Sequence, residues 1–113
     1  MILYNVTVMV DAEVAADWME WMRTHHIPEV MNSGYFVSHR LCKLLQPEPE
    51  QNSVTYAVQY FCTSGDKLTE YLEKVAPALR DKHTQRYGHK AQAFRTVLEI
   101  ISDDPALVSD TLG

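Results

Sequence analysis

The order of the hydrophobic periods along the chain constrains its fold more than any other feature. Residues 2–10 place apolar side chains at alternate positions, which is typical of a strand, and a helical stripe at three- and four-residue steps follows. Two further alternating segments, 35–45 and 53–62, flank a polar loop with prolines and predict a hairpin. A second helical stripe and a last strand over 91–101 complete the order β-α-β-β-α-β. This order predicts an α+β, ferredoxin-like fold with a four-stranded antiparallel sheet.

The helix ends are predicted from capping residues, prolines and a glycine. Asp11 is expected to cap the first helix, and Pro28 is expected to end or kink it because proline lacks a backbone N–H. Thr63 opens a sequence that is typical of a capping box before the second helix. Pro77 is expected to bend that helix, and Gly88 is expected to stop it.

Length and composition are those of a small globular domain. The 113 residues suffice for one hydrophobic core, and 46% of them are hydrophobic against 22% charged. We expect a single domain over residues 1–101. Residues 102–113 form an acidic tail, which we expect to fray or to pack on a neighbour.

Charge and hydropathy argue against nucleic-acid and membrane partners. The net charge is −5, so the sequence indicates no basic surface that could release counterions from phosphates. No apolar run approaches the roughly 20 residues of a membrane span, and the first residues lack the basic leader and cleavage site of a signal peptide. These features predict a cytoplasmic protein that binds neither nucleic acid nor membrane.

Cysteines and histidines do not form a metal-binding pattern. Cys42 and Cys62 are the only cysteines, and we expect them to be buried free thiols that do not face each other across the hairpin. No two histidines have the i, i+3 or i, i+4 spacing that chelates a metal on a helix. We therefore predict no metal site and no cofactor.

One face of the predicted sheet has no helix to cover it, because both helices of this fold lie on the other side. The predicted helix-facing set includes Ile2, Tyr4, Val6, Val8, Phe94, Leu98 and Ile100. The opposite face mixes apolar and polar side chains, namely Leu3, Asn5, Thr7, Met9, Thr55, Ala57, Gln59, Phe61, Arg95, Val97 and Glu99. An exposed surface of this kind predicts a homodimer that packs through the sheet face.

Polar residues of that face are candidates for a ligand site between two such sheets. Asn5, Gln59 and Arg95 are predicted to converge on an enclosed, partly polar space and to orient a small molecule there. The alternative is a solid dimer core in which these polar groups satisfy one another.

The histidine pair at the end of the first helical stripe is the candidate for chemistry. His25 falls on the apolar stripe with Trp21, so its ring is predicted to point at the sheet, whereas His26 falls on the flank. Either imidazole could act as a general base or contact a bound molecule. The alternative is structural, with a buried core histidine at 25 and a helix-end histidine at 26. His83 is predicted to be a surface or helix-end residue.

Three sequence blocks together resemble a bacterial family of small proteins that is described as a domain of unknown function. The blocks are WMEWMRTHHIPEV (residues 18–30), VTYAVQYFC (54–62) and APALRDKHTQRYG (76–88), and the resemblance spans residues 1 to about 101. In that family's pattern the recurrent histidine stands at the position of His26. The resemblance therefore makes His26, rather than His25, the candidate catalytic residue.

More distantly, the arrangement is similar to the dimeric α/β barrel superfamily. That superfamily includes cofactor-independent monooxygenases, EthD-like proteins, muconolactone isomerases and haem-degrading enzymes. The similarity implies a homodimer with a pocket between the helices and the sheet of each protomer. It implies no particular activity, because function does not follow from fold.

These residues support three hypotheses about function. The first is a homodimeric small-molecule-binding protein in which Asn5, Gln59 and Arg95 orient a polar ligand while His26 and Trp21 contact it. The second is an enzyme of the cofactor-independent monooxygenase or isomerase kind, with His26 as the base and Arg95 steadying an enolate-like anion. The third is a non-catalytic structural or partner-binding dimer. An open cavity that touches His26 would favour the first two over the third.

Overall fold

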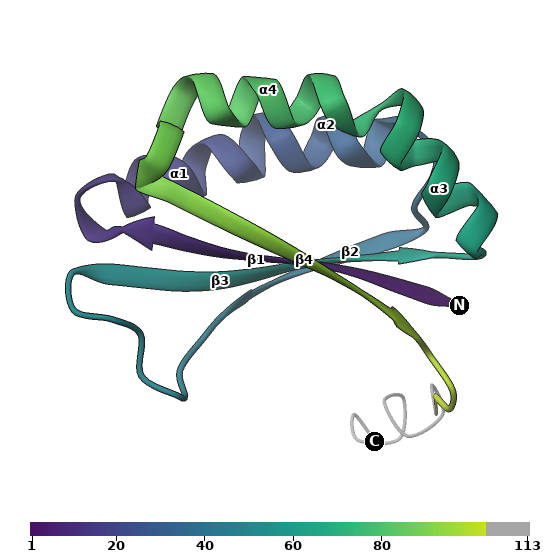
Figure 1. Cartoon of the computed structure of the whole chain (residues 1–113), viewed down its shortest axis with the longest axis horizontal. Coiled ribbons are helices and arrows are strands. Elements are labelled where there is room, and N and C mark those ends of the chain that lie inside the picture. The colour runs from purple at the N-terminus through teal and green to yellow at the C-terminus, as the bar shows by residue number, and fades with distance from the viewer. Residues whose placement is uncertain (104–113) are drawn as a thin grey trace, which may run out of the picture.

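The computed structural model describes residues 1–103, and its strands and helices follow the predicted order (Figure 1). The strands are β1 Ile2–Asp11, β2 Ser38–Lys43, β3 Ser53–Cys62 and β4 Ala91–Glu99. The helices are α1 Ala15–Trp21, α2 Ile27–Asn32, α3 Gly65–Lys74 and α4 Ala76–Tyr87. A π-helical turn, Met22–His26, joins α1 to α2, and short 3-10 turns, Ala12–Val14 and Gly88–Lys90, precede α1 and follow α4.

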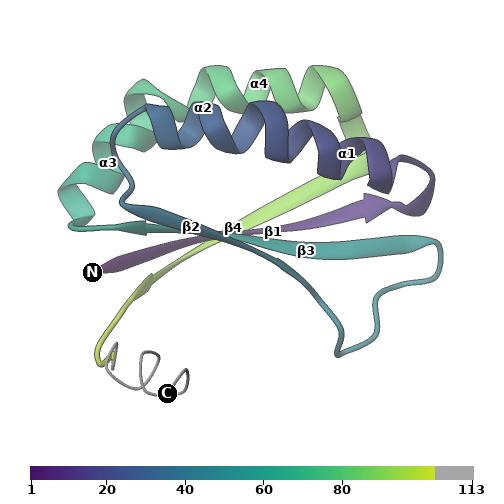
Figure 2. The same ribbon diagram turned by 180° about the vertical axis from the view of Figure 1, so that it is seen from behind.

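The strands form one antiparallel sheet in the order β2-β3-β1-β4, which confirms the predicted fold. The helices lie on one face of the sheet, and the segments α1–α2 and α4 run side by side across it (Figures 1 and 2). We call the other face, which has no helix in the described chain, the open face. The alternation along β1 explains this layering, since Tyr4, Val8 and Val10 turn toward the helices and are buried.

The core between the sheet and the helices consists largely of aromatic side chains. Trp18 of α1 is fully buried and stacks on Tyr56 of β3 with ring centroids 4.9 Å apart. Further along β3, the ring of Phe36 packs against Tyr60 at 5.1 Å and against Tyr71 of α3 at 4.7 Å. Each such ring removes about 150–250 Å² from water, so these contacts supply much of the cohesion between the two layers.

Of the two outcomes expected at Pro28, an end or a kink, the structure shows an interruption of the regular α-helix and not the end of the helical segment. The turn before Pro28 widens to a π-helix, in which the Ile27 N–H donates to the Met22 carbonyl, and α2 then continues to Asn32. Pro28 thus lies in the first turn of α2, where a missing N–H is tolerated. The extra residue in the wide turn rotates the side chains that follow by about 100° relative to a continuous α-helix.

This rotation decides which histidine faces the sheet. Ile27 and Val30 are buried and His26 is half-buried, whereas His25 is exposed. The prediction that His25 points at the sheet is therefore wrong, because it assumes an uninterrupted helical period through Pro28.

The remaining helix boundaries follow the sequence with small shifts. Ser64, rather than Thr63, caps α3, and its Oγ accepts a hydrogen bond from a backbone N–H of the first turn at 3.2 Å. Asp11 ends β1 and makes no side-chain cap, so that expectation is wrong. The second helical segment breaks at Val75, two residues before Pro77, which agrees with the predicted bend.

The side chains of β4 are distributed between the two faces in the opposite way to the prediction. Arg95 lies across from Val6 on the helix side together with Val97, whereas Phe94 and Leu98 lie on the open face. The adjacent apolar pair 97–98 gives no clear alternation on this largely exposed edge strand. Pairing with β1 sets the register instead, and a shift of one residue exchanges the faces.

Other predictions concern the tail, the membrane and the cysteines. The predicted tail, 102–113, lies almost wholly outside the described residues, and the domain boundary at 101 stays a prediction. Within residues 1–103, no helix is both long and apolar enough to cross a membrane. Cys42 and Cys62 are free thiols that do not face each other, as predicted, and they lie on different faces of the sheet. Cys62 is buried as expected, whereas Cys42 is only half-buried.

Gly88 ends α4 with φ +56° and ψ −133°, a backbone region that is essentially reserved for glycine. No atom lies within 4 Å of an added Cβ, so backbone strain alone would oppose a side chain there. We expect Gly88→Ala to lower the free energy of unfolding, measured by urea denaturation, by about 1–3 kcal/mol. Gly65→Ala at the start of α3 is the control, with an expected change below about 1 kcal/mol. Equal losses in both variants would contradict this account.

Candidate functional site

Two adjoining cavities lie between the helices and the sheet. The large lobe has a volume of about 210 Å³, and the small lobe has a volume of about 40 Å³. Both are lined by Val6, Met22, His26, Arg80 and Arg95. The large lobe extends toward the start of β4, and the small lobe extends into the aromatic core. The shared lining makes the two lobes one candidate site.

Arg80 and Arg95 give this site a positive charge. No carboxylate lines either lobe, and within residues 1–103 neither arginine belongs to an ion pair. Arg80 of α4 donates a hydrogen bond to the Tyr4 hydroxyl at 3.1 Å, which fixes its guanidinium beside the small lobe. Arg95 reaches the lobes from the exposed edge strand β4. Two guanidinium groups without carboxylate partners favour an anionic ligand.

His83 is held as a neutral imidazole by Trp18. The indole N–H of Trp18 donates to Nε2 of His83 at 3.0 Å, and an indole can only donate, so Nε2 carries no proton. The ring proton is therefore assigned to Nδ1, which makes that nitrogen a donor. Burial, together with the charge of Arg95, lowers the pKa of His83 and keeps the ring neutral at pH 7.

His26 is also neutral at pH 7. Burial is the main reason that the pKa of His26 falls to about 4; the adjacent His83 ring and the positive charges of Arg95 and Lys82 lower it further, while Glu29 opposes them. Its ring centroid lies 6.1 Å from that of His83. A neutral imidazole can both donate and accept a hydrogen bond, but with this pKa it is a weak base at neutral pH.

Trp21 packs behind the two histidines and lines neither lobe. Its ring centroid lies 5.4 Å from that of His26 and 5.9 Å from that of His83. The other side of its ring faces a shallow surface groove between the helices. Trp21 therefore supports the imidazoles rather than reaching into the cavity.

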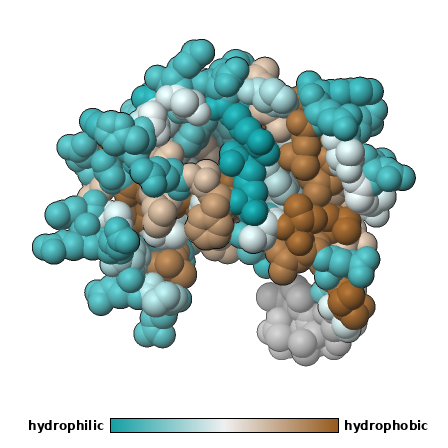
Figure 3. Space-filling view, in the orientation of Figure 1, coloured by the Kyte–Doolittle hydropathy of each residue, from teal (hydrophilic) through white to brown (hydrophobic). Residues whose placement is uncertain are grey.

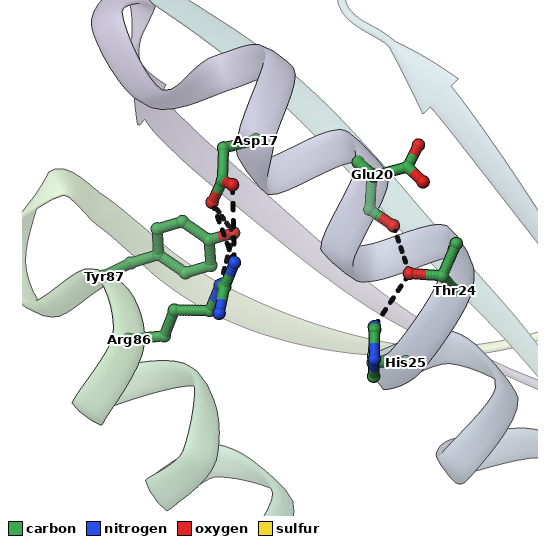
Figure 4. A network of polar contacts seen from close by, with 6 residues as sticks. All are labelled: Asp17, Glu20, Thr24, His25, Arg86 and Tyr87. Carbon is green, nitrogen blue, oxygen red and sulfur yellow. Dashed lines mark hydrogen bonds and ion pairs between the residues drawn. The ribbon is translucent and has the colours of Figure 1, made fainter.

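A polar network joins α1 to α4 beside Trp21 (Figure 4). Asp17 of α1 accepts a hydrogen bond from the Tyr87 hydroxyl at 2.8 Å and two from Nη2 of Arg86 at 3.3 Å. The guanidinium of Arg86 also lies 5.8 Å from the centre of the Trp21 ring. These contacts fix the spacing of the helices that cover the large lobe.

Figure 4 also shows His25 bonded to Thr24 of its own helical segment. His25 lines neither lobe. Its Nδ1 lies 2.8 Å from the hydroxyl oxygen of Thr24, and that hydroxyl donates to the Glu20 carbonyl at 2.7 Å. Because the hydroxyl proton is used in that bond, Nδ1 of His25 is the donor to Thr24. His25 has no part in the site.

The structure divides the predicted site residues between the two faces of the sheet. His26 and Arg95 line the lobes on the helix side, with Trp21 behind them. Asn5 of β1 and Gln59 of β3 lie opposite each other in the strand register, on the open face. The predicted convergence of Asn5, Gln59 and Arg95 is therefore wrong, because it depended on the inverted face of β4.

Two residues of the site were not identified as site residues from the sequence. Arg80 is not singled out, and His83 is expected at the surface or a helix end, whereas the structure half-buries it beside Trp18. A usable signal exists in the spacing of Leu79, His83 and Tyr87, which places all three on one face of α4.

The open face presents apolar side chains around a polar row. Phe94 is 54% exposed, Leu98 is 47% exposed and Met9 is 39% exposed. Among them, Nδ2 of Asn5 donates to the Thr96 hydroxyl at 3.3 Å, while its buried Oδ1 has no hydrogen-bond partner among the described residues. In Figure 3, apolar surface gathers on the side of the molecule where β4 ends. This surface is more apolar than predicted, because Phe94 and Leu98 belong to it.

Comparison with known families gives one match that covers most of the chain. The model of a domain of unknown function, DUF4286, matches residues 1–101. No curated protein matches the sequence.

Solved structures share the fold at low sequence identity. The heme-degrader MhuD from Mycobacterium tuberculosis, solved with two hemes bound in its active site, has a TM-score of 0.68 and 18% identity, covering 92% of this chain and 99% of its own. SnoaB from Streptomyces nogalater, described as a cofactor-independent oxygenase, has a TM-score of 0.59 and 15% identity, with 92% and 97% covered. A dimeric ferredoxin-like protein from an uncultured marine organism has a TM-score of 0.59 and 12% identity, with 91% and 97% covered. These likenesses confirm the ferredoxin-like fold.

The low pKa of His26 predicts that acid destabilises the protein. The unfolded chain takes up this proton near pH 6.5 and the folded chain only near pH 4, so the unfolded state binds more protons between these values. The stabilisation is complete above pH 6.5, and about 2 kcal/mol of it should be lost by pH 5.

Urea denaturation at pH 7.5 and pH 5 measures this loss. His26→Gln should lose less stability than the wild type over this interval. His25→Gln removes the neighbouring, exposed imidazole and should behave as the wild type does. If His26→Gln loses as much stability as the wild type between pH 7.5 and pH 5, groups other than His26 cause the acid destabilisation.

Proposed function

Because the chain belongs to DUF4286, a family described as a domain of unknown function, we propose its function from the site itself: a homodimeric protein that binds a small anionic ring compound between its helices and its sheet. The observation that carries this proposal is the pair of arginines, Arg80 and Arg95, without ion-pair partners among residues 1–103, on a cavity with no acidic lining. The whole chain has a net charge of −5, so the positive charge at this cavity is opposite in sign to that of the protein as a whole.

The size of the large lobe supports a single ring. At about 210 Å³ it exceeds the roughly 150 Å³ cavity that is known to admit benzene, and it lies below the roughly 300–1,000 Å³ typical of pockets for drug-sized ligands. Val6, Val8 and Met22 would contact the faces of the ring, and Arg95 would bind its anionic group. A tetrapyrrole is far larger than this cavity, so we assign no haem to it.

The two neutral histidines complete the proposed binding site. His26 would exchange a hydrogen bond with the ligand, and Nδ1 of His83 would donate one. Since both rings are uncharged at pH 7, the attraction for the anion comes from the arginines. In this proposal Trp21 holds the imidazoles in place from behind.

The open face supports the homodimer. Its exposed Phe94, Leu98 and Met9 would be buried by a second copy, and the marine protein of the same fold is described as dimeric. We therefore assign Asn5 and Gln59 to the interface, where the unpartnered Oδ1 of Asn5 could accept a hydrogen bond from the second copy.

An enzyme of the cofactor-independent monooxygenase or isomerase kind is the second candidate. It is supported by His26 and Arg95 lining the same cavity, as a base and an anion-stabilising group would. The pKa of about 4 for His26 favours binding over proton abstraction at neutral pH. Turnover of an enolisable aromatic compound that disappears in His26→Ala would favour the enzyme. The cavity at His26 argues against the third hypothesis, a purely structural dimer.

The binding proposal is tested with two rings of similar size, benzoate and benzamide, which differ in charge. Because the site is cationic, benzoate should bind at least about tenfold more tightly than benzamide in an NMR titration. Arg95→Gln should weaken benzoate binding about five- to tenfold and leave benzamide unchanged. Arg23→Gln removes the same charge from an exposed position on the π-helical turn and should have no effect. Similar affinities of the wild type for both rings would overturn the proposal.

The dimer is tested by sedimentation equilibrium. Phe94→Asp places a charge in the proposed apolar interface and should raise the dimer dissociation constant by about 100-fold or more. Val97→Asp is the matched control, because Val97 is on the same strand, 55% exposed, and on the helix side of the sheet. A wild-type protein that sediments as a monomer at micromolar concentration would exclude this interface.

A further inference from the structure

The small lobe is lined by a tyrosine whose hydroxyl the fold does not use. Tyr60 of β3 is 2% exposed, it lines this lobe, and its Oη has no hydrogen-bond partner among the described residues. Buried hydroxyls are nearly always paired, because an unpaired one costs about 1–3 kcal/mol. The packing of the core therefore does not account for the hydroxyl of Tyr60.

The ring of Tyr60, in contrast, is fully used. It packs against Phe36 at 5.1 Å and stacks beside Tyr4 at 6.2 Å, and a phenylalanine would make the same contacts. The neighbouring Tyr4 differs in this respect, because its hydroxyl accepts a hydrogen bond from Arg80. A tyrosine at position 60 thus adds one unpaired polar atom beside the small lobe, and its ring otherwise makes the contacts that a phenylalanine would make.

The hydroxyl of Tyr60 is a donor. Burial among the other tyrosines, with the nearby Tyr71 and Tyr4, raises the pKa of Tyr60 well above its ordinary value, so the proton stays on the oxygen. A group that keeps its proton favours an acceptor oxygen as its partner.

The small lobe has room for a substituent and not for a ring. Its volume of about 40 Å³ exceeds the roughly 10–15 Å³ that one water needs, and it is a small fraction of a cavity that admits benzene. The two lobes share His26, Arg80 and Arg95, so a ring in the large lobe lies next to the entrance of the small one.

We propose that the small lobe is a recognition subsite in which the hydroxyl of Tyr60 donates a hydrogen bond to a carbonyl oxygen carried by the anionic ring ligand. The inference rests on the proposed function and narrows its ligand class to rings that carry both an anionic group and a carbonyl substituent. A ligand without the carbonyl leaves the hydroxyl unpaired and binds more weakly.

The test compares 4-acetylbenzoate with 4-isopropylbenzoate, which have similar shapes and differ in the carbonyl. The wild-type protein should bind 4-acetylbenzoate about five- to tenfold more tightly in an NMR titration. Tyr60→Phe should bring the ratio of the two affinities close to one and leave the affinity for 4-isopropylbenzoate unchanged. Tyr35→Phe removes a hydroxyl from a tyrosine that lines neither lobe and should keep the wild-type ratio.

The outcomes separate this inference from the proposed function. If both probes bind with equal affinity to the wild type, or if Tyr60→Phe keeps the preference, the subsite is excluded while anion binding stands. If neither probe binds the wild type and benzoate does not bind either, both proposals fail together. If benzoate binds and the two larger probes do not, the small lobe does not accept a substituent and the subsite is excluded.

Thermal denaturation gives a readout that is independent of the ligand. Because the Tyr60 hydroxyl bonds no described residue, Tyr60→Phe should keep or raise the melting temperature. Tyr87→Phe removes a hydroxyl that donates to Asp17 at 2.8 Å and should lower it. A clear loss of stability in Tyr60→Phe would show that the hydroxyl has a structural partner and would overturn the inference.

Discussion

The wide turn before Pro28 determines what the first helical segment presents to the sheet. Proline cannot supply the N–H that a continuous α-helix requires, and the π-helical turn accommodates this by adding one residue to the turn. The side chains beyond Met22 are thereby rotated, so that His26 faces the cavity and His25 faces solvent.

The charge of the candidate site is opposite in sign to that of the chain as a whole. The chain is acidic, yet the walls of the cavity carry arginines and no carboxylate. The bond from Trp18 to His83 adds a donor of fixed orientation, and it depends on the same buried indole that stacks on Tyr56. Core packing and the polarity of the site are thus coupled through Trp18, because moving the indole would release the imidazole.

The sequence predicted the topology well because its strongest signals are local periods. The alternation in β1 and β3 identified the buried face of the central strands, and the order of elements sufficed for the fold. The faces of β4 were not predictable in this way, because an exposed edge strand has apolar residues on both sides and its register comes from pairing. The error grouped Arg95 with Asn5 and Gln59 on the open face, although the structure places Arg95 on the helix side with His26. Arg80 reaches the site through tertiary packing, which no single segment of sequence encodes.

The charges in the cavity have a consequence for the molecules that it would select. Guanidinium groups keep their charge at any pH found in a cell, and the lowered pKa values of His26 and His83 keep both imidazoles neutral at pH 7. Near neutral pH the charge of the protein's site is therefore constant, and only the guest ionises. A weakly acidic guest would be retained as its conjugate base and released when it regains its proton, so occupancy would follow the titration curve of the guest.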